Sequence, residues 1–110
     1  MSFNSKSYDL MKQLVDSEKE SAITSYGAIY NSNHEGYAVL LEEIEETEHE
    51  LSEIKKHLQQ VWENIKHDEK TIAADLVLIA LASESLILES AQIHAVTDKF
   101  IETVKPKIEE

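Results

Sequence analysis

Apolar residues recur at steps of three and four along most of the chain, which is the period of an amphipathic α-helix. The clearest series starts at Tyr37 and ends at Ile65, and all of its members are apolar except Thr47. The series consists of Tyr37, Leu40, Ile44, Thr47, Leu51, Ile54, Leu58, Val61 and Ile65. Because its steps of three and four alternate without a break, it predicts one long helix with a heptad-like apolar seam.

Weaker patterns predict a helix on each side of this one. Residues Lys6–Tyr30 carry apolar side chains at mixed steps of three and four, whereas Asn31–Gly36 contains turn formers and no periodicity. We therefore expect a first helix followed by a connection. Asp68 is suited to cap a third helix, which is predicted over Asp68–Val104 because Pro106 cannot continue it.

The third helix is apolar on nearly every side over Ile72–Leu88, with Asp75 and Glu84 as interruptions. A helix that is apolar all round is normally covered on several faces, but one chain supplies only two other helices. We therefore predict an all-α fold, a bundle of three main helices per chain that is completed by dimerisation or by a larger assembly.

Composition narrows the class of protein. The chain has 110 residues, so we expect residues 1–110 to form a single helical domain. Two Gly and one Pro are too few to separate the strands of a large sheet. The absence of cysteine excludes disulfide scaffolds, thiol nucleophiles and cysteine-ligated zinc.

The charge and the hydropathy of the chain indicate which binding partners and which location to expect. The formal net charge of −12 excludes direct nucleic-acid binding by a basic face, and leaves metal binding, docking on a basic protein, or solubility. Met1–Asp9 has no apolar signal region, and Ile72–Leu88 is short for a membrane span. We expect a cytoplasmic protein that does not bind membranes.

A dense run of glutamates over Glu42–Glu50 contains no Lys or Arg. A solvated helix face is one interpretation, but the mutual repulsion of these charges would also be relieved by a divalent cation with oxygen ligands. Glu43 and Glu46 stand three apart and can point the same way. Glu43 flanks the seam residue Ile44, so we expect it to be partly buried, whereas Glu42 projects away from the seam.

A second polar pair lies on the third helix, where Glu89 and Gln92 stand three apart among apolar residues. A carboxylate in such surroundings is rarely left unpaired. Glu89 either lies on an exposed side of the helix or joins Glu43 and Glu46 around one metal ion.

Two segments resemble a known family. Gly36–Glu46 is similar to the first motif of the MazG-like, all-α nucleotide pyrophosphohydrolases, which has a Glu pair and a further Glu three residues on, here Glu43 and Glu46. Glu89–Ile101 is similar to the second motif, Glu, two residues, Asp, except that Gln92 stands at the Asp position. The resemblance extends over about His34–Ile101, and the glutamine is typical of small phage-type members.

The resemblance implies a Mg²⁺-dependent hydrolase acting on acid anhydrides, which converts a nucleoside triphosphate to the monophosphate and pyrophosphate. It implies metal binding by Glu43, Glu46, Glu89 and Gln92, with Glu43 and Glu46 as the catalytic residues. It also implies a homodimer or homotetramer. Lys99 follows the second motif and is a candidate to contact a substrate phosphate, with a surface lysine as the alternative.

Other functions stay open. A catalytically silent acidic protein would bind nucleotides without hydrolysing them, or would inhibit a host nucleic-acid-binding partner by occupying its basic groove. The acidic run and Gln92 motivate both alternatives. His94 is expected to be a buried histidine, and Trp62 to pack in a core or an interface.

Overall fold

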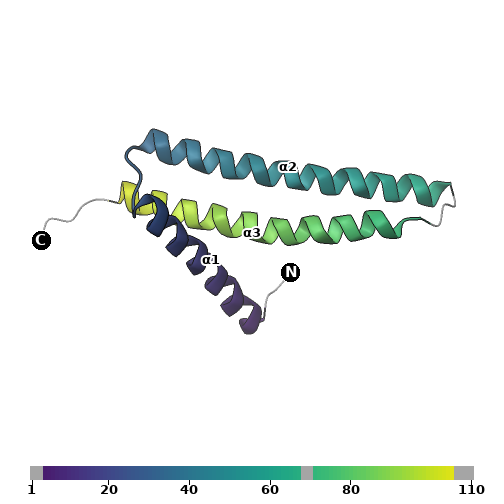
Figure 1. The fold of residues 1–110 in the computed structure, drawn as a ribbon, viewed down its shortest axis with the longest axis horizontal. Coiled ribbons are helices and arrows are strands. Elements are labelled where there is room, and N and C mark those ends of the chain that lie inside the picture. The colour runs from purple at the N-terminus through teal and green to yellow at the C-terminus, as the bar shows by residue number, and fades with distance from the viewer. Residues whose placement is uncertain (1–3, 68–70, 106–110) are drawn as a thin grey trace, which may run out of the picture. The chain divides into compact units, whose positions relative to one another are not determined.

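The computed structural model describes residues 4–67 and 71–105, and within these ranges the regular structure is entirely helical. Figure 1 shows α1 (Ser5–Tyr26), α2 (Asn33–Lys66) and α3 (Ala73–Val104). The predicted all-α class with three helices is therefore confirmed. The third helix begins later than predicted, and its expected cap, Asp68, lies outside the described residues. The dimer predicted to cover this helix stays a prediction.

The chain divides into two compact units, and α2 and α3 contribute to both. Unit 1 comprises Met1–Ile44 and Ala91–Glu110, so it holds α1, the start of α2 and the end of α3. Unit 2 comprises Glu45–Ser90, which is the rest of α2 and α3. Whether residues 1–110 behave as a single domain also stays a prediction.

The first helix ends four residues before its predicted end. Its N-terminus is capped by the Asn4 side chain, which accepts the Ser7 N–H at 2.8 Å. At the other end, Gly27 has φ 89° and ψ 172°, a conformation that is essentially restricted to glycine. The apolar pattern continues past this point to Tyr30, but the backbone at Gly27 cannot continue a helix.

The second helix begins inside the segment predicted as a connection, so that prediction is wrong for Asn33–Gly36. The Ser32 hydroxyl accepts the Glu35 N–H at 3.1 Å, and the Glu35 carboxylate accepts the Asn31 N–H at 3.1 Å. This is a reciprocal cap close to a capping box, and it satisfies donors that the first helical turn leaves unpaired. The turn-forming residues thus start the helix.

Unit 1 is held together where the start of α2 and the preceding loop meet α3. The Tyr30 N–H donates to Thr103 Oγ1 at 2.8 Å, and the Tyr30 ring meets Phe100 edge to face, with centroids 6.2 Å apart. Gly36 is buried against the same ring, since a Cβ at this position would lie 3.0 Å from Phe100 carbons. Close approach of α2 to α3 in this unit therefore requires a glycine.

We expect Gly36→Val to destabilise the fold by about 1–3 kcal/mol, because the added methyl groups must displace the Phe100 ring. Urea unfolding of the two proteins measures the difference. Ala38→Val is the matched control, since Ala38 is exposed on the same helix and this variant loses only about 0.5 kcal/mol of helix propensity. Equal losses in both variants would contradict close packing at Gly36.

Unit 2 is an antiparallel helix pair in which each helix half-buries one stripe of residues and leaves its other faces exposed. His57 Nδ1 lies 3.0 Å from Asp75 Oδ1, and Val61 is buried. The apolar seam of α2 is only partly covered in this unit, and its residues Thr47 and Ile54 are half-buried. The large apolar side chains that remain exposed in this unit are Leu51, Leu58, Trp62, Ile65, Leu76, Val77, Leu78, Leu81, Ile87 and Leu88.

The apolar faces of α3 thus stay uncovered by the described chain. By length and composition alone, this helix of 32 residues is able to cross a membrane, so length does not exclude a span, contrary to the expectation from Ile72–Leu88. The same criterion is met by core helices of soluble proteins. The cytoplasmic location stays a prediction.

Candidate functional site

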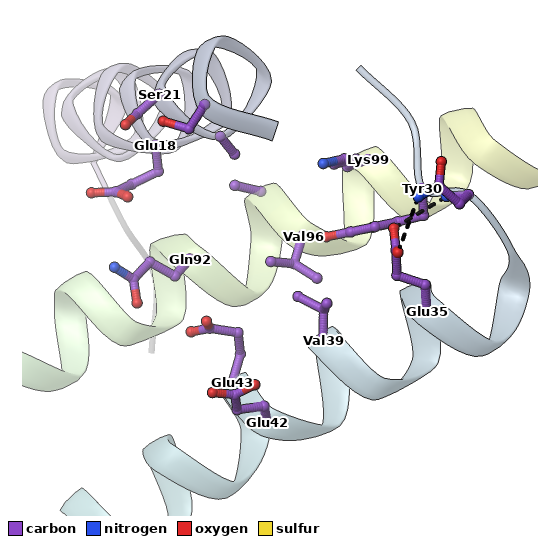
Figure 2. Close-up of a pocket in the computed structure, with 14 residues that line it drawn as sticks. Glu18, Ser21, Tyr30, Glu35, Val39, Glu42, Glu43, Gln92, Val96 and Lys99 are labelled. Atoms are coloured by element: carbon purple, nitrogen blue, oxygen red, sulfur yellow. Dashed lines mark hydrogen bonds between the residues drawn. The ribbon is translucent and has the colours of Figure 1, made fainter. Parts of the chain in front are cut away.

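Unit 1 contains a pocket of about 750 Å³ bounded by α1, the loop after it, the start of α2 and the end of α3. Figure 2 shows Glu18 and Ser21 of α1 on one side, Val39, Glu42 and Glu43 of α2 on another, and Gln92, Val96 and Lys99 of α3 between them. Ala22, Ser25, Tyr30, Asn31, Glu35 and Ala95 complete the lining. A pocket of this volume is large enough for a nucleotide.

The pocket brings together three of the site residues predicted from the sequence, Glu43, Gln92 and Lys99. Glu43 is half-buried, as its angular position beside the seam predicted, and Gln92 is half-buried on α3. Glu42, expected to project away from the seam, is exposed, although it also lines the pocket. Carboxylate and amide oxygens therefore face one cavity from two helices.

Lys99 is the buried charged residue of the pocket. Its residue is 4% exposed, and its Nζ lies 4.3 Å from the centroid of the Tyr30 ring, within range of a cation–π interaction. The interpretation of Lys99 as a surface lysine is therefore wrong. Ala91, Ala95 and Lys99 are spaced four apart and all buried, so the small alanines accompany the lysine on the packed face of α3.

Tyr30 supports this arrangement and was missed as a site residue in the sequence. Burial raises the pKa of its hydroxyl, and the charges of Glu35 and Glu43 raise it further. The neutral phenol therefore keeps its proton. Asn31, Glu18 and Ser21 were missed too. Only the Ser32–Glu35 spacing before the apolar seam signalled that this loop is structured.

Unit 2 brings together Glu46 and Glu89. One carboxylate oxygen of each lies within 4.8 Å of the other. Burial raises the pKa of the Glu89 carboxyl, and the charges of Glu46 and Glu50 and a hydrogen bond with Glu46 add to the rise. Glu89 is half-buried, so its alternative placement on an exposed side of the helix is wrong, whereas Glu46 is exposed.

The surroundings of Glu89 fit a metal ligand. Its Oε2 atom is buried, and among the described residues no N–H or O–H group of a side chain or the backbone donates to it. Two such carboxyl groups either share a proton or require a cation between them. Mg²⁺ takes oxygen ligands of this type, so the donor set fits that ion.

The raised pKa of Glu89 predicts a pH-dependent stability. The folded chain holds the Glu89 proton to a higher pH than the unfolded chain, in which the ordinary pKa is 4.5. Rising pH therefore lowers the stability from about this value, and the loss is complete above the folded-state pKa. We expect Glu89→Gln to raise the stability at pH 7 by less than about 1 kcal/mol, because solvent screens a half-buried group, and to lose this gain at about pH 4.

Thermal unfolding of wild type and variant at the two pH values, without divalent cations, measures this effect. Glu84→Gln is the matched control, because Glu84 is an exposed glutamate on the same helix. Equal gains in the two variants, or a gain that persists at low pH, would show that burial and the neighbouring charges do not destabilise the charged form of Glu89.

The four predicted metal ligands divide between the two units in pairs. Glu43 and Gln92 belong to unit 1, and Glu46 and Glu89 to unit 2. Within one continuous helix, Glu43 precedes Glu46 by three residues on α2, and Glu89 precedes Gln92 by three on α3. Each helix therefore presents its pair on one face, as the spacing predicted.

Two other expectations are corrected. His94 is not buried, since its side chain is 54% exposed and its Nδ1 lies 3.2 Å from Asp98 Oδ2. Trp62 does not pack in a core of the described chain, since it is 53% exposed with the Lys66 ammonium 5.8 Å from its ring centroid. Neither residue lines the pocket of unit 1.

Comparison of the chain with protein-family models, with curated proteins and with solved structures gives no match. The resemblance to the MazG-like family therefore rests on the two motifs alone.

Proposed function

We propose that the protein is a Mg²⁺-dependent nucleoside triphosphate pyrophosphohydrolase of the MazG-like type. The observation that carries the proposal is the Glu46–Glu89 pair, two carboxylates held together with a buried oxygen that no described group satisfies. Glu43 and Gln92, each three residues away on the same helix, complete the ligand set that the two motifs imply.

The acidic character of the chain makes a metal central to this function. A protein with net charge −12 repels a triphosphate, so binding requires cations between them. Bound Mg²⁺ supplies charge neutralisation at the phosphates and lowers the pKa of an attacking water. The two motifs imply that the carboxylates of Glu43, Glu46 and Glu89 would hold the ion, with the amide oxygen of Gln92 as a neutral ligand.

The pocket of unit 1 is the proposed nucleotide site. Its 750 Å³ is lined by one buried cation, Lys99, and by polar groups of α1 and the loop after it. We expect the Lys99 ammonium to contact a phosphate. Ser21, Asn31 and Gln92 offer hydroxyl and amide groups that are suited to hydrogen bonds with a base or a sugar.

Product analysis tests the proposal. The purified protein is incubated with ribo- and deoxyribonucleoside triphosphates, with Mg²⁺ or with EDTA, and the products are separated by ion-exchange chromatography. We expect the monophosphate and pyrophosphate to form in equal amounts and only with Mg²⁺. Release of diphosphate and inorganic phosphate, or the absence of turnover for all nucleotides, would contradict the proposed reaction.

A second function is favoured by one residue. Gln92 supplies a neutral oxygen where the motif has an anionic one, which weakens metal binding and suits a protein that binds nucleotides without hydrolysing them. Calorimetric titration with a nucleoside triphosphate and Mg²⁺ separates the two functions. Binding without product formation would support sequestration, and the absence of both would move attention to a protein partner.

A further inference from the structure

The wall that α1 contributes to the pocket of unit 1 is polar. Its lining residues are Glu18, Ser21, Ala22 and Ser25, which follow one face of the helix at steps of three and four. None of them is an apolar residue larger than alanine. A helix face that packs against protein normally carries large apolar side chains. The composition of this wall therefore suits contact with a polar ligand better than contact with another helix.

Glu18 is the acid of this wall, and neither a motif nor a helix cap accounts for it. The other acids that line the pocket have such roles, since Glu42 and Glu43 belong to the first motif and Glu35 accepts the Asn31 N–H in the cap of α2. Glu18 is half-buried, and no group in the described part of the chain pairs with its carboxylate. A carboxylate only accepts hydrogen bonds, so this position favours a ligand that offers N–H groups.

The charges of the pocket assign different parts of a nucleotide to different places. Lys99 is buried in the pocket and is the group that we expect to contact a phosphate. Figure 2 shows Glu18 on the same side of the pocket as Gln92, and Lys99 lies about two helical turns further along α3. Because a carboxylate repels phosphate oxygens, the surroundings of Glu18 suit the base and not the phosphates.

We propose that Glu18 determines the base specificity of this pocket, by accepting hydrogen bonds from a base that carries an exocyclic amino group, with guanine bound most tightly and uracil least. The inference rests on the proposed nucleotide site. Guanine presents its N1–H and its 2-amino group side by side, and these two donors match the two oxygens of one carboxylate. Uracil presents a single N–H between two carbonyl oxygens, which a carboxylate repels.

Ser21 is suited to read the rest of the same edge. It stands three residues after Glu18 on the wall of α1, and its hydroxyl is able to donate a hydrogen bond. The guanine O6 atom, next to N1–H, is an acceptor. Glu18 and Ser21 together therefore match the order donor, donor, acceptor of the guanine edge. Adenine and cytosine offer one amino group each, so we expect them to bind with intermediate affinity.

Calorimetric titration in the presence of Mg²⁺ tests the specificity, with the α,β-methylene analogues of GTP, ITP and UTP as ligands. These analogues lack the bond that the proposed reaction cleaves. The base of ITP differs from guanine only by the missing 2-amino group, so the comparison of GTP with ITP isolates one contact. For the wild type we expect the GTP analogue to bind about tenfold more tightly than the ITP analogue, and about tenfold to a hundredfold more tightly than the UTP analogue.

Glu18→Gln tests the residue. The amide keeps the size of the side chain but both donates and accepts, so it no longer repels a carbonyl edge. We expect the dissociation constants for the GTP and UTP analogues to come within about threefold of each other in this variant. Glu20→Gln is the matched control, because it makes the same charge change at an exposed position of α1 that does not line the pocket. It is expected to keep the wild-type preference.

The possible failures of this inference and of the proposed function are distinguishable. Equal affinities of the wild type for the three analogues, or an unchanged preference in Glu18→Gln, would overturn the role of Glu18 and leave the nucleotide site in place. Equal effects of Glu18→Gln and Glu20→Gln would overturn it too, because the charge of α1 and not one contact would then control binding. If the wild type bound none of the analogues, the nucleotide site itself would be wrong, and the inference with it.

Discussion

Glu43→Gln is expected to lower the Mg²⁺-dependent turnover of the preferred nucleoside triphosphate by about a hundredfold or more. Glu43 is the half-buried acid of the first motif and lines the pocket of unit 1. The substitution keeps the size of the side chain but replaces an anionic ligand by a neutral oxygen. Because Glu43 faces other acids of the pocket, loss of its charge relieves repulsion, and the variant is expected to remain folded.

Steady-state rates at saturating Mg²⁺, together with circular dichroism and thermal unfolding, check this expectation. Glu45→Gln is the matched control, since it makes the same charge change at an exposed position of α2 that does not line the pocket. Retained activity in Glu43→Gln would exclude this glutamate as a ligand. Equal losses in both variants would show that the overall charge of the helix, and not one carboxylate, is responsible.

Lys99→Met is expected to weaken nucleotide binding about tenfold to a hundredfold, because a charge-assisted hydrogen bond to phosphate contributes about 1.5–3 kcal/mol. Lys99 is buried in the pocket, and its ammonium lies against the Tyr30 ring. Methionine fills a similar volume without the charge, so the packing of Ala95 and Tyr30 around this position is retained. Calorimetric titration of both proteins with a nucleoside triphosphate and Mg²⁺ gives the two dissociation constants.

Lys66→Met is the control for this experiment. Lys66 also stacks on an aromatic ring, that of Trp62, but it is exposed and does not line the pocket. We expect its nucleotide affinity to equal that of the wild type. If Lys99→Met binds equally well, Lys99 has a packing role, and the phosphates are held by the metal alone.

The sequence predicted the helices better than their ends. The alternating apolar steps from Tyr37 to Ile65 lie within α2, and the turn formers after Tyr30 were correctly placed outside α1. Asn33–Gly36 was misplaced because the same polar residue types form turns and helix caps, and only the reciprocal contacts of Ser32 and Glu35 decide between them. Such contacts depend on side-chain geometry that a residue pattern does not contain.

The candidate site was predicted only in part, because it also depends on side-chain geometry that the residue pattern does not contain. Glu43 was correctly predicted to be half-buried, although its neighbour Ile44 is exposed; Glu43 stands three residues after Leu40 and four before Thr47, which are both half-buried. The burial of Lys99 was not predicted, since a lysine normally reaches solvent. Its spacing of four from Ala91 and Ala95 was the available signal, whereas His94 lies off this face and is exposed. The contribution of Tyr30 depends on a loop, whose path has no periodicity to read.

The small number of buried side chains affects the stability of the folded chain in solution. Within the described residues the buried apolar side chains are Val15, Tyr30, Val61, Ala91 and Ala95, and no large side chain is fully buried. An isolated chain gains little of the hydrophobic free energy that normally offsets conformational entropy. In the dimer that the sequence predicts, folding would therefore depend on protein concentration: refolding would follow second-order kinetics, the unfolding temperature would rise with protein concentration, and dilution would hasten proteolysis.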